Sequence, residues 1–178
     1  MKELEPVIHP FEPIYDECSR VLILGTMASP ASRDSGFYYG HKRNRFWPLM
    51  AALFDESVPM DIDAKRALLL RNGVALWDVL SACKIYRADD ASIQDPQAFD
   101  FDQLFAALPG LRVFANGQKA ADLYRELVFP HTGVPITALP STSPANAGWG
   151  RERLLKQWSV VSDQWSVALS ATWLHPRH

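Results

Sequence analysis

Three stretches of the chain carry side chains that can bind a ligand or move a proton. The first is a small, polar stretch that becomes aromatic and basic, GTMASPASRDSGFYYGHKRNRFW, at residues 25–47. The second is a lone carboxylate, Asp78, in the apolar run VALWDV, and the third is the hydroxyl-rich LPSTSPANAGW at residues 139–149. Aromatic faces beside cations can stack a base while holding its backbone, and hydroxyls with backbone amides can bind a phosphate oxygen.

The carboxylate of Asp78 follows Leu76 and Trp77 in an otherwise apolar segment. A buried ionised group is costly unless it is paired. Asp78 therefore either accepts hydrogen bonds from the backbone amides of a neighbouring loop or faces a ligand site, and the residues alone leave both open.

The loop at residues 141–146 also has two interpretations. Its hydroxyls either cap the helix that follows or bind a phosphate oxygen together with backbone amides. Pro140 and Pro144 bracket the loop and stiffen it, which suits a segment that inserts into a partner.

Two tyrosines, Tyr38 and Tyr39, precede a basic cluster at residues 41–45. Either ring can belong to the core or stack on a ligand, whereas the aromatic residues 46–47 at a helix start are expected in the core. Asn44, just before that helix, is most simply its N-cap.

Four short apolar runs predict buried strands at residues 21–24, 74–79, 113–115 and 134–139. Helical spacing and helix-stop signals predict helices at residues 46–54, 61–72, 101–108, 118–128 and 149–161. We expect residues 1–19 to form an extended arm and residues 87–100 a long polar connection. Residues 162–178 are a C-terminal extension to which the pattern assigns no structure.

This alternation predicts one α/β domain over residues 1–178, with three α/β/α layers around a mostly parallel four-stranded sheet. The polar strand ends, at Gly25, Asp78, Asn116 and Pro140, should meet at one rim. Ligands of open α/β sheets bind at that rim.

Composition narrows the classes of function. The 178 residues have a net charge of −2, which excludes a broad polyanion-binding field but not a local basic face. The two cysteines, Cys18 and Cys83, offer no zinc or iron–sulfur ligand set. Without a signal-peptide segment or a membrane-length apolar run, we expect a cytoplasmic monomer, at the nucleoid of a bacterial cell, that uses no metal or cofactor.

The three stretches together resemble the uracil-DNA glycosylase superfamily, most closely its hypoxanthine (deoxyinosine) DNA glycosylase branch. The resemblance extends from about residue 10 to residue 161, with the motifs in the family's order. It implies a monofunctional enzyme of base excision repair that flips a damaged nucleotide out of duplex DNA and hydrolyses its N-glycosidic bond. Hypoxanthine is the expected base, and a uracil or mismatch specificity is the alternative.

The resemblance also implies roles for individual residues. Base binding falls on Gly25, Thr26, Met27, Tyr39, Asp78 and Asn116. Tyr39 would stack on the base, the backbone amides after the first strand would meet it, and Asp78 would read it. An ionised Asp78 can accept a hydrogen bond from N1–H of hypoxanthine, which adenine lacks, although it also suits N3–H of uracil.

DNA binding and catalysis are implied for a second group of residues. Contacts to DNA fall on His41, Arg43, Ser141, Ser143, Pro144 and Asn146, with residues 141–146 entering the minor groove and Ser143 on a phosphate. Catalysis falls on Asn44, the asparagine of an HxxN stretch on which the hypoxanthine branch relies.

Two residues depart from the pattern of many relatives. Met27 stands where they place the Asp or Asn that positions the attacking water, and Ser141 stands where uracil enzymes place a histidine. Methionine cannot hold a water, and serine cannot support a departing uracil anion as histidine does. A DNA- or nucleotide-binding module of the same fold without catalytic activity is therefore a further alternative, which would bind a lesion without releasing a base.

Overall fold

A parallel sheet of four strands lies at the centre of the computed structural model, which describes the backbone of residues 1–173 and the side chains of residues 1–162. The strands are β2 (Val21–Gly25), β3 (Val74–Asp78), β6 (Arg112–Asn116) and β7 (Ile136–Leu139), in the order β3-β2-β6-β7. Every residue of β2 and β3 is buried, because both faces of the sheet are covered. The predicted α/β class and central four-stranded parallel sheet are confirmed.

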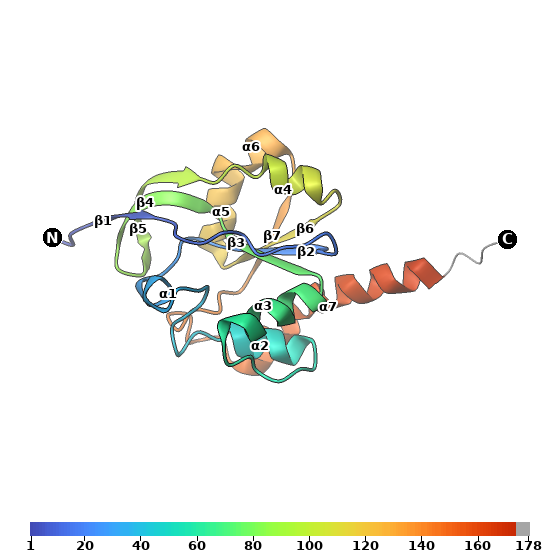
Figure 1. The fold of residues 1–178 in the computed structure, drawn as a ribbon. Helices are drawn as coiled ribbons and strands as arrows, with labels where there is room; N and C mark the ends of the chain where they lie inside the picture. Colours follow the sequence, from blue (N-terminus) through green and yellow to red (C-terminus); the bar gives the residue numbers. More distant parts are fainter. Residues whose placement is uncertain (174–178) are drawn as a thin grey trace.

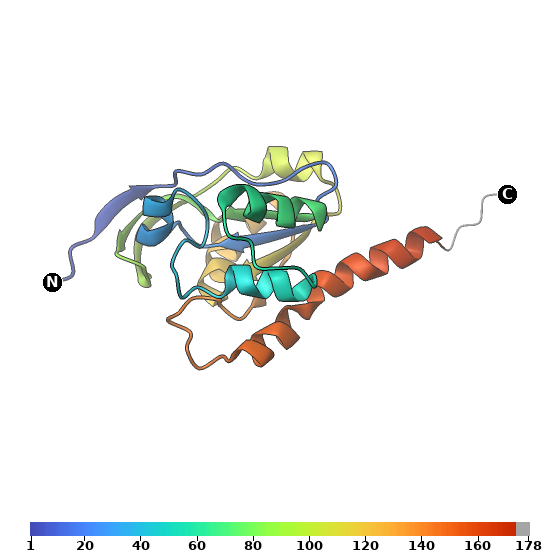
Figure 2. The same ribbon diagram turned by 60° about the horizontal axis from the view of Figure 1, so that its bottom comes forward.

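Helices cover both faces of this sheet (Figures 1 and 2). On one side lie α4 (Asp102–Ala107), α5 (Gln118–Leu127) and α6 (Phe129–Thr132). On the other side lie α2 (Phe46–Leu53), α3 (Ile62–Arg71) and the first part of α7 (Arg151–Trp173). The short α1 (Pro30–Ser35) follows β2 after four residues.

The helix boundaries follow local chemistry. Asp61 accepts a hydrogen bond from the Ala64 N–H at 2.7 Å and so caps α3. Pro48 is tolerated in α2 because it lies in the first turn, where its missing N–H has no intrahelical partner. Two short helices, α1 and α6, were not expected, and α7 continues into the segment to which the pattern assigned no structure, with residues 174–178 outside the described residues.

A second sheet was not predicted. Strands β1 (Glu5–Ile8), β4 (Leu80–Tyr86) and β5 (Asp89–Ala98) pair antiparallel in the order β1-β4-β5. Only Val79 separates β3 from β4, so the second sheet continues outward from the carboxyl end of the first.

One expectation is therefore wrong. Residues 87–100 are not a polar connection, because most of them form β5. The N-terminal arm includes β1, a strand that the sequence pattern did not reveal. No side chain of β5 is buried and only Val7 is buried in β1, so neither strand carries the alternating apolar pattern by which a strand is recognised. Pairing with β4 holds both strands in place.

The rest of the N-terminal arm lies along the edge of the parallel sheet. Ile14 and Leu76 exchange two backbone hydrogen bonds of 2.9 Å, which occupy polar groups at the free edge of β3.

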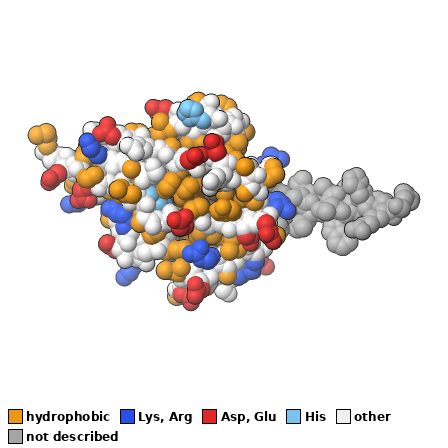
Figure 3. All heavy atoms as spheres, turned by 45° about the horizontal axis from the view of Figure 1, so that its top comes forward, with side chains coloured by type: hydrophobic (Ala, Val, Ile, Leu, Met, Phe, Trp, Pro, Cys, Tyr) orange, Lys and Arg blue, Asp and Glu red, His pale blue; other side chains and the backbone are white. Residues whose placement is uncertain are grey.

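The surface has no dominant sign of charge on the face shown in Figure 3, where acidic and basic side chains are scattered among apolar ones. Within the part of the chain that the structure describes, no helix is long and apolar enough to span a membrane.

Candidate active site

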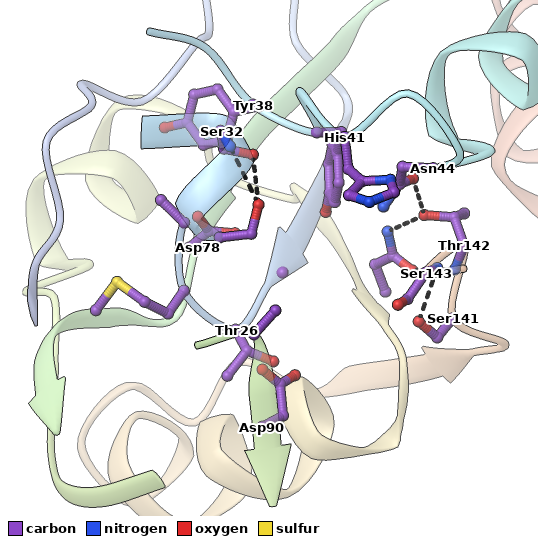
Figure 4. Close-up of a pocket in the computed structure, with 17 residues that line it drawn as sticks. Thr26, Ser32, Tyr38, His41, Asn44, Asp78, Asp90, Ser141, Thr142 and Ser143 are labelled. Atoms are coloured by element: carbon purple, nitrogen blue, oxygen red, sulfur yellow. Dashed lines mark hydrogen bonds between the residues drawn. The ribbon is translucent and has the colours of Figure 1, made fainter. Parts of the chain in front are cut away.

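A pocket of about 120 Å³ opens where the parallel strands end. Gly25, Asp78 and Asn116 are the last residues of β2, β3 and β6, and the loop after β7 supplies residues 141–143 to its wall. Figure 4 shows polar side chains entering this space from several elements. The strand ends thus meet at one rim, as the alternation of strands and helices predicts.

Gly25 is required by close packing at the bottom of the pocket. A Cβ atom at this position would lie 2.4 Å from Oδ1 of Asp78 and 2.9 Å from the hydroxyl oxygen of Tyr39. Both contacts are far below van der Waals distance, so any side chain here would displace the carboxylate and the ring.

The carboxylate of Asp78 is paired with a histidine that sequence reasoning did not single out. His9 Nε2 lies 2.6 Å from Asp78 Oδ2, and both side chains are buried. His9 Nδ1 accepts a hydrogen bond from the Phe11 N–H at 3.2 Å, so the proton must be on Nε2 and the ring is neutral. His9 therefore donates to Oδ2, and Oδ1 is left for a ligand.

A second carboxylate, Asp90, lies in the same pocket with Thr26 beside it (Figure 4). It is the second residue of β5 and comes from the sheet that was not predicted. Asp90 is partly buried, and this partial burial raises its pKa. The negative charge of Asp78 raises the pKa further, and a hydrogen bond with Thr26 lowers it.

The pocket is electronegative. Two carboxylates and one histidine, His41, are its titratable groups apart from tyrosines, and among the described residues no lysine or arginine lines it. Such a pocket suits a ligand that offers N–H donors or accepts a proton, and it disfavours a phosphate.

Asn44 lies at the end of a chain of side-chain hydrogen bonds. Its Oδ1 accepts from the Thr142 hydroxyl at 2.8 Å, and Oγ1 of Thr142 accepts from Asn116 Nδ2 at 2.9 Å. The Thr142 N–H donates back to Asn116 Oδ1 at 2.9 Å.

Oδ1 of Asn44 also accepts from the Phe46 N–H at 2.9 Å. The N-cap of α2 is nevertheless Arg45, one residue later, so the prediction that Asn44 is the N-cap is wrong. With both lone pairs of Oδ1 occupied, the amide orientation is fixed. Among the described residues no hydrogen bond uses Nδ2 of Asn44, so its two hydrogens are the donors that remain for a ligand.

The two tyrosines have different surroundings. Tyr38 packs in the core while also lining the pocket, and its hydroxyl donates to the Glu12 carbonyl at 2.8 Å. Tyr39 stacks on Phe46 with ring centroids 4.1 Å apart and lines the pocket, in a left-handed backbone conformation with φ of 54°. Its buried hydroxyl has no hydrogen-bond partner among the described residues, and burial followed by the Asp78 charge raises the pKa of Tyr39.

The loop at residues 141–149 is held to the body of the protein by Arg45. The guanidinium donates to the carbonyls of Ser143 at 3.1 Å and Asn146 at 3.0 Å, and also to the carbonyl of Trp149. Within the loop, Asn146 Nδ2 donates to the Ser141 carbonyl at 3.0 Å. These hydrogen bonds hold the loop in place, and Ala145, Ala147 and Gly148 are exposed on it.

A second, open groove of about 900 Å³ adjoins the pocket. It runs between the turn of the β4–β5 hairpin, at Arg87, and the loop that carries Asn146 and Trp149. Arg43, which is exposed, lies in the segment between the tyrosines and α2. Arg87 is thus a basic group of the groove, and Arg43 is exposed between His41 and Asn44, which line the pocket.

Ten of the residues selected from the sequence line the pocket, namely Gly25, Thr26, Met27, Tyr39, His41, Asn44, Asp78, Asn116, Ser141 and Ser143. Asn146 lines the adjoining groove, while Arg43 and Pro144 line neither space. The roles assigned to these residues remain predictions.

Four residues that shape the site were missed: His9, Arg45, Asp90 and Thr142. His9 and Asp90 come from strands with no apolar pattern, so no local signal marks them. Thr142 lies within the hydroxyl-rich stretch and Arg45 within the basic cluster, and in both cases the contact is made far along the chain.

Comparison with known proteins agrees with this arrangement. The sequence profile of the Uracil DNA glycosylase superfamily matches residues 12–163. The chain belongs to the uracil-DNA glycosylase superfamily. All the residues that line the pocket lie inside the matched region, whereas His9, the partner of Asp78, precedes it.

Two curated proteins that are similar to this chain come from species of the genus Methanosarcina. A hypoxanthine DNA glycosylase of Methanosarcina acetivorans is 33% identical over 153 residues, which cover 85% of this chain and 95% of the relative. A protein of the same name from Methanosarcina barkeri is 33% identical over 138 residues, covering 76% of this chain and 86% of that one.

A solved structure has the same fold. The solution NMR structure of a proposed uracil DNA glycosylase from Methanosarcina acetivorans superposes with a TM-score of 0.75 at 31% identity, covering 87% of this chain and 96% of the other. Together with the family match, these relatives confirm the predicted enzyme class, a DNA glycosylase that hydrolyses N-glycosidic bonds, with DNA as the substrate.

Proposed function

We propose that this DNA glycosylase is monofunctional and releases hypoxanthine from deoxyinosine in DNA by flipping the nucleotide into the pocket at the strand ends. The reaction is hydrolysis of the bond between N9 of the base and C1′ of the sugar, and it leaves an abasic site for base excision repair. Flipping is necessary because the bond is inaccessible within the base stack.

The observation that carries the choice of base is the pairing of Asp78. Because a neutral His9 donates to Oδ2, Oδ1 of the carboxylate is available as an acceptor inside the pocket. Hypoxanthine presents N1–H on its Watson–Crick edge, whereas N1 of adenine carries no hydrogen and would face the carboxylate with a lone pair. The two curated relatives, both named hypoxanthine DNA glycosylase, support the same substrate.

The remaining pocket residues suit a flat, polar base. Tyr39, supported from behind by Phe46, offers a ring face for stacking. Among the hydrogen bonds of the described residues none uses the backbone N–H groups of Thr26 and Met27, so these donors are available for the O6 atom. The pocket thus has an acceptor and donors for one edge of the base.

The sugar end of the nucleotide would lie toward Asn44, on the side opposite Asp78 in Figure 4. The amide hydrogens of Asn44, which have no other use, can hold the oxygen of the attacking water near C1′. Fixing a water in this way lowers the entropic barrier to its attack. Asn44 then takes over the positioning that Met27 cannot perform.

Hydrolysis without strand cleavage follows from the composition of the pocket. A β-lyase needs an amine that forms a Schiff base with the sugar, and among the described residues no lysine lines the pocket. Lys42 is close along the chain, but it is exposed.

Uracil is the second candidate, because Oδ1 of Asp78 can also accept from N3–H of that base. The carboxylate of Asp78 disfavours it, since uracil departs as an anion. A mismatch-specific enzyme would have to recognise the base on the opposing strand, and that base does not enter the pocket.

The test is base release from matched duplexes that carry deoxyinosine, deoxyuridine, deoxyxanthosine or deoxyadenosine at one position. We expect release of hypoxanthine first, and a loss of at least about 100-fold for Asn44→Ala, which removes the proposed water-positioning amide. Asp78→Ala should reduce the preference for hypoxanthine over adenine. Faster release of uracil by the wild type would support the second candidate, and lesion binding without any release would support the non-catalytic alternative.

A further inference from the structure

The pocket must accommodate the negative charge that develops on the base as it leaves the sugar. When the bond between C1′ and N9 breaks, its electron pair stays on the base. Two carboxylates, Asp78 and Asp90, line the pocket without a lysine or arginine among the described lining residues. Negative charge developing on the base would be repelled by each of these groups that is ionised. The base must therefore leave as a neutral molecule, which requires a proton.

We propose that Asp90 is the general acid that donates this proton to N7 of the departing hypoxanthine. The proposal rests on the proposed function, because it assigns a further catalytic residue to that reaction. N7 is the most basic ring nitrogen of this purine and is not used by the Watson–Crick edge that Asp78 would read. In Figure 4 Asp90 approaches the pocket from below, with Asp78 to the left and Asn44 to the right.

The surroundings of Asp90 favour its protonated form. It faces Asp78 from β3, Lys119 from α5 and Asp89 from its own strand, and Thr26 forms a hydrogen bond with it. Tyr39 and Cys83 are also close enough to interact electrostatically with the Asp90 carboxyl group. Burial is the main cause that raises the pKa of Asp90, and the charge of Asp78 adds to it, whereas Lys119 and Thr26 lower it.

The other carboxylate is unsuited to this role. Asp78 accepts a hydrogen bond from the neutral His9 at 2.6 Å, which stabilises its charge. Two carboxyl groups with different surroundings in one pocket are a recurrent basis for dividing acid and acceptor roles. Asp78 reads the base and Asp90 supplies the proton.

The step balances without any other reactant. The carboxyl proton of Asp90 moves to N7, the C1′–N9 bond breaks, and its electron pair remains on N9, so hypoxanthine leaves neutral with hydrogens on N1 and N7. The oxygen of water bonds to C1′, and the proton that this water loses restores the carboxyl group of Asp90. The sum is deoxyinosine and water giving hypoxanthine and an abasic sugar.

The inference also gives the pocket a way to prefer purines. Uracil has no N7, so Asp90 has no such nitrogen to protonate and uracil would depart as an anion beside the carboxylate of Asp78. Adenine has N7 but lacks the N1–H that Asp78 accepts. Hypoxanthine satisfies both groups.

The experiment compares Asp90→Asn with Asp95→Asn. Asparagine at position 90 keeps the size and a hydrogen-bond donor but cannot transfer a proton, whereas Asp95 lies on the same strand, outside the pocket, and pairs with Lys84 at 3.0 Å. Under single-turnover conditions we expect Asp90→Asn to release hypoxanthine about 100-fold or more slowly with little change in duplex affinity. Asp95→Asn should match the wild type.

The dependence of the base-release rate on pH distinguishes an acid from a residue that only supports the structure, because only the loss of an acid changes that dependence. The wild-type rate should fall as pH rises through the raised pKa of Asp90, because the acid form is lost, and this fall should be absent in Asp90→Asn. A probe that needs no variant is a duplex with 7-deaza-2′-deoxyinosine, which lacks the acceptor nitrogen. The wild type should bind it and cleave it as slowly as Asp90→Asn does.

Hypoxanthine release by Asp90→Asn at the wild-type rate and with the wild-type pH profile would overturn the inference and leave the proposed function intact. Rapid cleavage of the 7-deaza substrate by the wild type would do the same. If the wild type releases no hypoxanthine at all, the proposed function fails and the inference fails with it.

Discussion

His9 and Asp78 are 69 residues apart in the chain, yet His9 Nε2 lies 2.6 Å from Asp78 Oδ2 in the interior. His9 follows β1 of the antiparallel sheet, and Asp78 ends β3 of the parallel sheet. The contact therefore joins the two sheets at the pocket. It also fixes which carboxylate oxygen can meet a ligand.

His9→Phe should impair both stability and base selection. The ring volume stays, but the buried Asp78 carboxylate loses its donor, and such a charged hydrogen bond contributes about 1.5–3 kcal/mol. Urea unfolding should show a loss of this size, and the ratio of hypoxanthine to adenine release should fall. His9→Gln, whose amide N–H can replace Nε2–H, should restore part of both; equal behaviour of the two variants would contradict the assigned role.

Thr142→Val should slow base release while keeping the shape of the loop. The change removes the hydroxyl that fixes the amide of Asn44 and leaves Asn116 without an acceptor. We expect a fall in the single-turnover rate of about ten-fold or more, with a smaller effect on duplex affinity. Thr142→Ser keeps the hydroxyl and should stay within a few-fold of the wild type. A serine variant as slow as the valine variant would show that packing of the methyl group matters instead.

Gly25→Ala should abolish activity through a direct clash. The new methyl group would lie 2.4 Å from Oδ1 of Asp78 and would also overlap the hydroxyl of Tyr39. Base release should fall below detection, and thermal unfolding should show whether the fold survives. Gly150→Ala is the matched control, because nothing lies within 4 Å of the added Cβ there. An active Gly25→Ala enzyme would mean that the base does not occupy this part of the pocket.

Two arginines in one segment should respond differently to removal. Arg43 is exposed and lies in the chain between His41 and Asn44, which line the pocket. If it contacts a phosphate, Arg43→Ala should lower DNA affinity and reduce the slope of log K against log salt by about 1. Arg45 donates instead to backbone carbonyls of the loop at residues 141–149. Arg45→Ala should therefore weaken lesion binding with an unchanged salt slope. Binding titrations at several salt concentrations distinguish the two effects.

Asp90→Asn should change how stability depends on pH. Because burial raises the pKa of Asp90, the native state binds this proton more tightly than the unfolded state does. Wild-type stability contributed by this group is therefore lost as pH rises through the raised pKa. Thermal unfolding should show that the stability of Asp90→Asn relative to the wild type increases as pH rises toward neutral and decreases as pH falls. A difference independent of pH would contradict the assigned protonation.

The sequence alone predicted the parallel sheet and the location of the pocket. Strands such as β2 are apolar throughout because they are buried on both faces, so the run VLIL reveals the strand without knowledge of its neighbours. Parallel strands all end at the same edge, so the polar residues Gly25, Asp78 and Asn116 were expected together. The motif resemblance then selected the superfamily, which the comparisons confirm.

Only the tertiary structure decided which polar groups meet inside the pocket. Strand β5 has no buried side chain, so periodicity cannot reveal it, and without it Asp90 had no place in the site. His9 reaches Asp78 through the pairing of β1 with β4, and Thr142 reaches Asn44 across 98 residues. Apolar burial leaves a pattern in the local sequence because it repeats with the period of the strand or helix. A hydrogen bond between two distant side chains leaves no such pattern, and the fold alone determines it.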